Sequence, residues 1–224
     1  MSATRERLVE AGAGVLVPGD LTIPEDPRGI VVFAHGSGSS RRSPRNCQVA
    51  KALNDDGFAT LLFDLLTPEE ELDRANVFDT PLLGRRLAAA TGWLHQQPET
   101  GGLPLGYFGA STGAAAALIA AADLGHQVSA VVSRGGRPDL AAPRLGEVMA
   151  PTLLIVGGLD EQVLELNRQA QRELRCANDL EVVAGATHLF EEPGTLQAVA
   201  RLASDWFARH LAGTRAPEPA LHST

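Results

Sequence analysis

The pentapeptide GASTG, at positions 109–113, carries the clearest chemical signal in the sequence. It lies between an apolar run and an alanine-rich segment, as expected for a serine on a sharp turn from a strand into a helix. Such a strained turn admits only small neighbours, which explains the glycines two positions before and after Ser111. The turn exposes the Ser111 hydroxyl and directs the backbone N–H of Thr112 toward a developing oxyanion. The pattern predicts a nucleophile; the alternative is a glycine-rich junction without chemistry.

A serine hydroxyl needs a base to remove its proton, and the base needs a carboxylate to orient it. For a serine on this kind of turn, the expected chain order is serine, then Asp or Glu, then His. Asp160 in VGGLDE and His188 in ATHLF follow Ser111 in that order, each just after an apolar run. We therefore predict Ser111 as nucleophile, His188 as base and Asp160 as the acid that orients it.

Other residues compete for two of these roles. Asp139 also follows an apolar run and remains an alternative acid, and Glu161 is adjacent to Asp160. Of the six histidines, only His35 and His188 follow apolar runs. His35 precedes a glycine, so we expect it to shape a turn, and His188 to be the base.

The loop GSGSS, at 36–40, is small and follows the first apolar run of the predicted sheet. A second oxyanion donor is expected from this loop, and we assign it to the backbone N–H of Ser37, alongside that of Thr112. The loop lacks the Gly-Lys-Ser/Thr that completes a phosphate-binding P-loop, so nucleotide binding is not expected.

Several arginines follow the same predicted strands. We hypothesise that Arg41 and Arg137 bind an anionic group on a substrate, with Arg42, Arg45 and Arg134 in the same loops. The alternative is that these arginines are solvated or ion-paired within the protein.

The elements that position these residues can be read from short apolar runs that alternate with segments of helical periodicity. The apolar runs lie at 30–34, 58–63, 103–108, 128–133, 152–156 and 180–183. The helical segments lie at 46–56, 81–97, 114–124, 162–174 and 195–211. This alternation predicts an α/β fold with a mostly parallel twisted sheet and helices on both faces. Because ligands of such sheets bind beyond the carboxyl ends of the strands, all the candidate residues are expected at one edge.

The ends of the chain differ from this pattern. Segments 9–17 and 21–24, separated by Pro-Gly-Asp, predict an N-terminal antiparallel edge hairpin. We expect a single domain over residues 1–212 and a disordered, Pro-containing tail over residues 213–224. The one sizeable excursion, at 65–80, is too short for a large cap domain, which predicts a shallow site for a small or protruding substrate.

Composition excludes several classes of protein. The chain has 224 residues, 44% of them hydrophobic, and a net charge of -8, which argues against a nucleic-acid-binding protein. No apolar run approaches the roughly 18 residues of a membrane span, and the first residues lack the apolar stretch of a signal peptide. A cytoplasmic protein is the expectation. The two cysteines, Cys47 and Cys176, lack metal-binding spacing, so no metal is expected.

The sequence resembles the α/β-hydrolases, and most closely their compact dienelactone hydrolase-like branch, over residues 8–212. The resemblance rests on FAHGSGSS (33–40), SPRN (43–46), GASTG (109–113), VGGLDE (156–161) and THLFEEPG (187–194). It implies esterase-type chemistry on small carboxylic esters or lactones, without a cofactor. Similar domains are sometimes fused to phosphoribosyltransferases.

One departure from that family affects the expected substrate. Dienelactone hydrolases proper use a cysteine nucleophile, whereas this chain has Ser111, which favours a general serine hydrolase over dienelactone cleavage. Amidase, peptidase or thioesterase activity on the same scaffold is the first alternative. A binding protein that has the fold but no catalysis is the second, and the order of Ser111, Asp160 and His188 argues against it.

Overall fold

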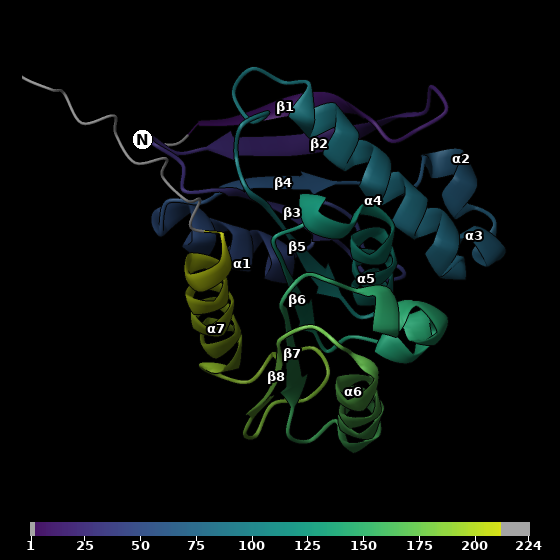
Figure 1. The fold of residues 1–224 in the computed structure, drawn as a ribbon, viewed down its shortest axis with the longest axis vertical. Helices are drawn as coiled ribbons and strands as arrows, with labels where there is room; N and C mark the ends of the chain where they lie inside the picture. Colours follow the sequence, from purple (N-terminus) through teal and green to yellow (C-terminus); the bar gives the residue numbers. More distant parts are fainter. Residues whose placement is uncertain (1–2, 212–224) are drawn as a thin grey trace, which may run out of the picture.

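One eight-stranded sheet forms the centre of the protein (Figure 1). The computed structural model describes residues 3–211, so the predicted tail at 213–224 lies outside the described residues. The strands are β1 (Ala3–Glu10), β2 (Leu16–Ile23), β3 (Ile30–Ala34), β4 (Ala59–Phe63), β5 (Leu105–Ala110), β6 (Ala130–Arg134), β7 (Thr152–Gly157) and β8 (Asn178–Val183). They lie in the order β1-β2-β4-β3-β5-β6-β7-β8.

Most neighbouring strands are parallel, as the sequence predicts. β1 pairs with β2 and β2 with β4 in antiparallel fashion, and every other pair is parallel. Every residue of β3 to β7 is buried, because helices cover both faces of these strands. The expected fold class, a mostly parallel sheet with an N-terminal antiparallel hairpin, is confirmed.

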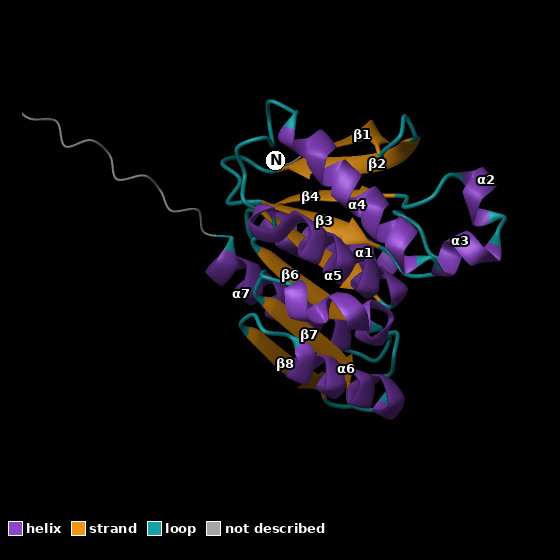
Figure 2. Ribbon diagram, turned by 45° about the vertical axis from the view of Figure 1, so that its right-hand side comes forward, coloured by secondary structure: helices purple, strands orange, loops and turns teal. Residues whose placement is uncertain are grey.

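The helices divide between the two faces of the sheet (Figures 1 and 2). Their bounds are α1 (Pro44–Asp55), α2 (Pro68–Glu71), α3 (Arg74–Phe78), α4 (Thr80–His95), α5 (Thr112–Leu124), α6 (Glu161–Glu173) and α7 (Thr195–His210), with 3₁₀ segments η1 (Gly125–Gln127) and η2 (Pro138–Glu147). α1 and α7 pack on one face, against Val31 and Phe33 of β3. α4 and α5 pack on the other, against Val32 and Ala34. Alternate residues of one strand therefore support both layers.

The N-terminal hairpin turns at a different place from the predicted one. The Pro-Gly-Asp sequence at 18–20 lies inside β2, and the turn spans 11–15, where Ala11 N–H donates to Val15 O at 2.9 Å. Three successive residues at 12–14 have positive φ, including both glycines. Gly19 serves packing instead: a Cβ there would lie 2.7 Å from Val9 Cγ2. The expected turn was wrong because glycine and proline mark close packing as well as turns.

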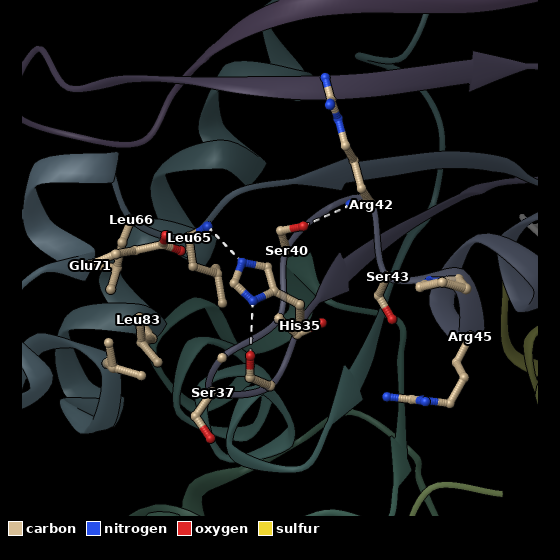
Figure 3. Close-up of a pocket in the computed structure, with 15 residues that line it drawn as sticks. His35, Ser37, Ser40, Arg42, Ser43, Arg45, Leu65, Leu66, Glu71 and Leu83 are labelled. Carbon is tan, nitrogen blue, oxygen red and sulfur yellow. Dashed lines mark hydrogen bonds between the residues drawn. The ribbon is translucent and has the colours of Figure 1, made fainter. Parts of the chain in front are cut away.

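The excursion at 65–80 forms two short helices, α2 and α3, and no large cap domain. Leu65, Leu66 and Glu71 of this excursion line one side of a cavity that the loop after β3 borders (Figure 3). The excursion is thus a wall beside the carboxyl edge of the sheet. None of the helices in the described part of the chain is both long and apolar enough to cross a membrane.

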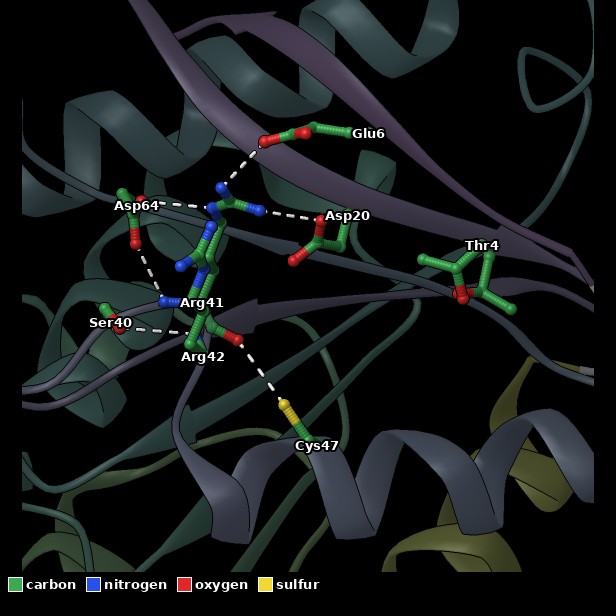
Figure 4. Close-up of polar contacts among 9 residues, drawn as sticks. Thr4, Glu6, Asp20, Ser40, Arg41, Arg42, Cys47 and Asp64 are labelled. Carbon is green, nitrogen blue, oxygen red and sulfur yellow. Dashed lines mark hydrogen bonds and ion pairs between the residues drawn. The ribbon is translucent and has the colours of Figure 1, made fainter.

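Arg41 joins four segments near this edge (Figure 4). Its guanidinium, only 7% exposed, contacts Asp20 Oδ1 at 2.7 Å, Glu6 Oε1 at 2.8 Å and Asp64 Oδ2 at 3.3 Å. Its backbone N–H also donates to Asp64 Oδ1 at 2.8 Å. These partners come from β2, β1 and the loop after β4, so Arg41 ties the hairpin to the loop after β3. The structure thus shows Arg41 ion-paired within the protein, which is the alternative to binding a substrate.

We predict that Arg41→Met lowers the free energy of unfolding by roughly 2 kcal/mol, because it leaves three carboxylates without their cation. The loss is limited because the more exposed of these carboxylates remain hydrated. Urea unfolding monitored by circular dichroism measures the change. Arg42→Met is the matched control: Arg42 is the exposed neighbour, and its loss should change stability by about 0.5 kcal/mol or less. Equal unfolding midpoints for the two variants would contradict a structural role for Arg41.

Candidate active site

Ser111 lies on a strained turn between β5 and α5, as predicted. Its φ of 52° and ψ of -121° are unusual for a residue with a side chain. Hydrogen bonds to the neighbouring strand and loop hold this conformation: Ser111 N–H donates to Arg134 O at 3.2 Å, and Arg137 N–H donates to Ser111 O at 3.1 Å. The turn is therefore fixed by tertiary contacts and leaves the Ser111 side chain at the carboxyl edge of the sheet.

The glycines at 109 and 113 are required by close backbone approach. A Cβ at Gly113 would lie 2.2 Å from Ala34 O and 2.4 Å from His35 O, and one at Gly109 would lie 2.4 Å from Ala114 Cα. The atoms that a Cβ would meet at either glycine belong to the backbone, which cannot shift without disturbing the strand or the helix. The start of α5 therefore lies directly against the end of β3, and the spacing of the two glycines follows from that contact.

His188 and Asp160 are brought together from loops after β8 and β7. His188 Nδ1 lies 2.6 Å from Asp160 Oδ2, within hydrogen-bond distance. The Asp160 side chain is 15% exposed and that of His188 is 38% exposed, so the carboxylate is the more buried of the two groups. Asp139, the alternative acid, instead accepts two hydrogen bonds from Arg137, at 2.8 and 2.7 Å. The geometry thus pairs His188 with Asp160.

The loop that carries His188 has a support that sequence patterns do not reveal. Glu192 accepts hydrogen bonds from Thr187 Oγ1 at 2.6 Å and from Thr187 N–H at 3.1 Å. These hydrogen bonds from Thr187 lower the pKa of Glu192, so it remains ionised. No short sequence motif predicts a hydrogen bond between Thr187 and a carboxylate five positions later, so this role of Glu192 emerges only from the structure.

A cavity of about 230 Å³ contains Ser111 and His188. The residues that line it are Gly36, Ser37, Ser39, Ser43, Arg45, Asn46, Ala110, Ser111, Arg134, His188 and Leu189. Across residues 3–211, no hydrogen bond joins the Ser111 hydroxyl to His188; the shared cavity is what brings the two side chains together. Such bonds often tighten only when substrate binds.

The two predicted oxyanion donors lie in neighbouring segments. Gly36 approaches Ser111 so closely that a Cβ on it would lie 3.1 Å from Ser111 Cβ. The backbone N–H of Ser37 donates to the side-chain Oγ1 of Thr112 at 2.8 Å. The structure therefore brings the loop at 36–40 to the nucleophile, with the Ser37 amide engaged by a hydroxyl.

His35 holds the base of this loop. Its Nε2 accepts a hydrogen bond from Leu65 N–H at 3.1 Å, and its Nδ1 lies 3.1 Å from Gly36 O. Burial lowers the pKa of His35 below its ordinary value, so the ring stays neutral. His35 joins the loops after β3 and β4, consistent with the predicted turn-shaping role.

A larger cavity, of about 570 Å³, lies on the other side of the loop at 36–40 (Figure 3). Leu65, Leu66, Val77 and Leu83 provide its apolar surface. The two cavities share Gly36, Ser37, Ser39, Ser43 and Arg45. Ser, Arg, Asn and His residues predominate in the lining of the cavity that contains the nucleophile, whereas the lining of the larger cavity includes a group of aliphatic side chains.

The arginines proposed to bind substrate are both engaged elsewhere. Arg41 has the three carboxylate partners described above, and Arg137 forms the bidentate pair with Asp139. Neither residue lines the two cavities. Arg45 and Arg134, which the sequence placed in the same loops, do line the cavity that contains Ser111.

A strained serine at the end of a central parallel strand, with an Asp–His pair from later loops, defines an α/β-hydrolase fold. The chain belongs to the dienelactone hydrolase family, whose sequence model matches residues 17–212. The expected family is thus confirmed.

Individual relatives agree with this assignment. A dienelactone hydrolase from Anabaena variabilis is 54% identical, with a TM-score of 0.89 over 93% of this chain and 99% of that one. A dienelactone hydrolase-like promiscuous phosphotriesterase from metagenomic libraries is 22% identical, with a TM-score of 0.74 over 93% and 98% of the two chains, and shares the fold.

Two curated Mycobacterium tuberculosis proteins, from strains CDC 1551 and H37Rv, are 67% identical over 210 residues. Each bears the name "Putative phosphoribosyl transferase". The match covers 93% of this chain but 47% of those proteins, so the chain spans about half the length of the curated relatives it matches.

We predict that Gly113→Ala destabilises the protein by about 3 kcal/mol, the upper end of overpacking costs, because the methyl group would meet two backbone carbonyls. Thermal unfolding measures this change. Gly92→Ala is the matched control, because Gly92 lies in α4 with nothing within 4 Å of its would-be Cβ, and alanine there should stabilise by about 0.5–1 kcal/mol. Similar stabilities for the two variants would refute the close approach of α5 to β3.

Proposed function

We propose that the protein is a serine hydrolase that cleaves small carboxylic esters or lactones through an acyl-enzyme intermediate. The observation that carries this proposal is the 2.6 Å contact between His188 Nδ1 and Asp160 Oδ2, on a cavity that Ser111 shares with His188. The contact orients the ring so that its other nitrogen, Nε2, is available as a base. The family assignment supports hydrolase chemistry.

In the proposed reaction, Ser111 Oγ attacks the ester carbonyl while His188 Nε2 accepts the hydroxyl proton. The tetrahedral intermediate then expels the alcohol, which takes the proton from His188. Water attacks the resulting acyl-enzyme with His188 again as base, and the acid is released as Ser111 regains its proton. Asp160 stabilises the imidazolium that forms in each half-reaction.

The proposed oxyanion donors are the backbone N–H groups of Thr112 and Ser37. Thr112 begins α5, where backbone N–H groups have no helical partner. The Ser37 N–H already donates to Thr112 Oγ1, so an oxyanion must replace that hydroxyl at the amide. The Thr112 side chain therefore occupies the donor position until the carbonyl oxygen arrives.

The two cavities support a substrate of limited size. The cavity around Ser111 measures about 230 Å³, enough for a scissile carbonyl with small substituents. An apolar group on the other side of the ester can enter the larger cavity, beside Leu66 and Val77. A serine nucleophile, in place of the cysteine of dienelactone hydrolases proper, favours general esters or lactones. Amide or thioester preference is an outcome that substrate profiling would reveal.

We predict that Ser111→Ala lowers kcat/KM for p-nitrophenyl acetate roughly 10⁴-fold, because the alanine cannot form the acyl-enzyme. The same variant should lose labelling by a fluorophosphonate probe, detected by intact mass. Cys47→Ala serves as the control for an exposed nucleophile outside the cavity, and it should keep both activity and labelling.

Labelling that persists in Ser111→Ala would refute the assignment of the nucleophile. A wild-type protein that neither reacts with the probe nor cleaves esters, amides or thioesters would instead support the non-catalytic alternative.

We predict that Asp160→Asn lowers kcat/KM about 10²- to 10⁴-fold, because the amide no longer holds the required tautomer of His188 or stabilises its cation. Asp139→Asn is the matched control, and it should retain activity within about tenfold because Asp139 contacts Arg137 instead. Steady-state hydrolysis of p-nitrophenyl acetate distinguishes them. A larger loss in Asp139→Asn would reverse the assignment of the acid.

A further inference from the structure

Arg134 is the last residue of β6 and lies directly beside the nucleophile. It is paired with Ala110 across the sheet, and its carbonyl oxygen accepts the hydrogen bond from Ser111 N–H. Its side chain is only 7% exposed, yet it lines the cavity that contains Ser111 and His188. The backbone of Arg134 therefore helps to hold the nucleophile, while its side chain borders the same cavity.

The guanidinium of Arg134 has no counter-charge among the described residues. Within residues 3–211, its Nε and Nη1 are buried without a hydrogen-bond partner, and it forms no ion pair. The guanidinium carbon lies over the ring of Phe190, 5.9 Å from the ring centroid. By contrast, Arg41 and Arg86 are equally buried and both contact carboxylates. A buried cation left without an anion is costly unless something binds it.

The guanidinium nevertheless stays charged at neutral pH. Burial, together with the nearby charge of Arg45, lowers the pKa of Arg134 to about 10. This value is still well above neutral, so a ligand in the cavity meets a full positive charge.

Arg45 brings a second cation to the same cavity. It lies in the first turn of α1, two positions after the N-cap residue Ser43 (Figure 3). Its Nε is buried without a partner in the described chain, while its Nη1 contacts the exposed carboxylate of Glu191 at 3.0 Å. None of the residues that line the cavity carries a carboxylate. The lining therefore combines two guanidinium groups with serine hydroxyls and the start of a twelve-residue helix.

We propose that Arg134 and Arg45 form an anion subsite beside Ser111 that takes a phosphate monoester group carried by the substrate. A phosphate monoester carries a charge of about -1.5 to -2 at neutral pH, so it can bind the unpartnered Arg134 and also Arg45, which contacts the exposed Glu191, more strongly than a singly charged carboxylate can. A phosphate group also has three terminal oxygens, enough to engage both arginines and a serine hydroxyl of the lining together. The substrate class is then a carboxylic ester that carries a phosphate monoester group on one side of the scissile bond. The group on the other side of that bond enters the larger cavity.

The subsite is tested first by direct binding, which does not depend on the proposed function because it is measured on the Ser111→Ala protein. Isothermal titration calorimetry with inorganic phosphate should show saturable binding that is about tenfold or more weaker in S111A/R134M. The matched control is S111A/R28M: Arg28 also lies over an aromatic ring, Phe58, but on the opposite edge of the sheet, and its loss should not change the affinity.

Three outcomes would overturn the proposal. They are the absence of phosphate binding at millimolar concentration, equal weakening by R28M, and tighter binding of acetate than of phosphate. The last result would indicate a carboxylate subsite.

Folding does not obscure the result. Because Arg134 has no carboxylate partner within residues 3–211, R134M should unfold at the same temperature as the parent or a higher one. If it unfolds at a lower temperature, S111A/R45M gives an independent reading, since Arg45 is 32% exposed and less needed for packing. R45M should also weaken phosphate binding several-fold, and an unchanged affinity would contradict the subsite.

Catalysis provides the second test, and this one rests on the proposed function. In protein that retains Ser111, kcat/KM is compared for two p-nitrophenyl carboxylic esters. One carries a phosphate monoester group, and the other is its neutral analogue. R134M should reduce the phosphorylated-to-neutral ratio about tenfold or more, while R28M leaves it unchanged. An unchanged ratio in R134M would overturn the subsite as a determinant of specificity. If the wild-type protein hydrolyses neither ester but still binds phosphate, the proposed function is contradicted and the anion subsite is not.

Discussion

The close approach of α5 to the end of β3 determines the geometry of the site. Gly113 lies so near Ala34 O that even a methyl group would overlap with it. This contact places the loop at 36–40 beside Ser111, which allows the Ser37 amide to reach Thr112 Oγ1 at 2.8 Å. The nucleophile, both candidate oxyanion donors and the boundary between the two cavities therefore depend on one backbone contact, so small residues on both segments are a physical requirement.

Buried arginines are used in two different ways in this fold. Arg41 and Arg86 are neutralised by carboxylates of the protein, and they tie the N-terminal hairpin and the α2 segment to the rest of the structure. Arg134 is equally buried but faces the cavity with no such partner in the described residues. The chain has a net charge of -8, so carboxylates outnumber basic groups overall. The unpaired cation beside the nucleophile therefore reflects the arrangement of residues at that cavity and not the overall composition.

Most of the fold could be predicted because strands β3 to β7 are short, fully buried apolar runs separated by helical segments. The hairpin turn was misplaced because Gly19 is required for packing against Val9, whereas Gly12 and Gly14 provide the positive φ of the turn. The ion pairs of Arg41 could not be predicted because its partners are 21 to 35 residues away along the chain. No local pattern connects a loop arginine to carboxylates on a distant hairpin and on the loop after β4.

Local sequence patterns suffice to predict the mostly parallel sheet, the turn that carries Ser111 and the edge at which Asp160 and His188 lie. Strand and turn patterns decide these features because they depend on residues close together in the chain. Tertiary structure alone decided that His188 pairs with Asp160 while Asp139 pairs with Arg137. It also decided that Arg134 faces the cavity while Arg41 does not. The carboxyl edge of a parallel sheet gathers many polar loops at once, and only their packing in three dimensions selects which side chains meet.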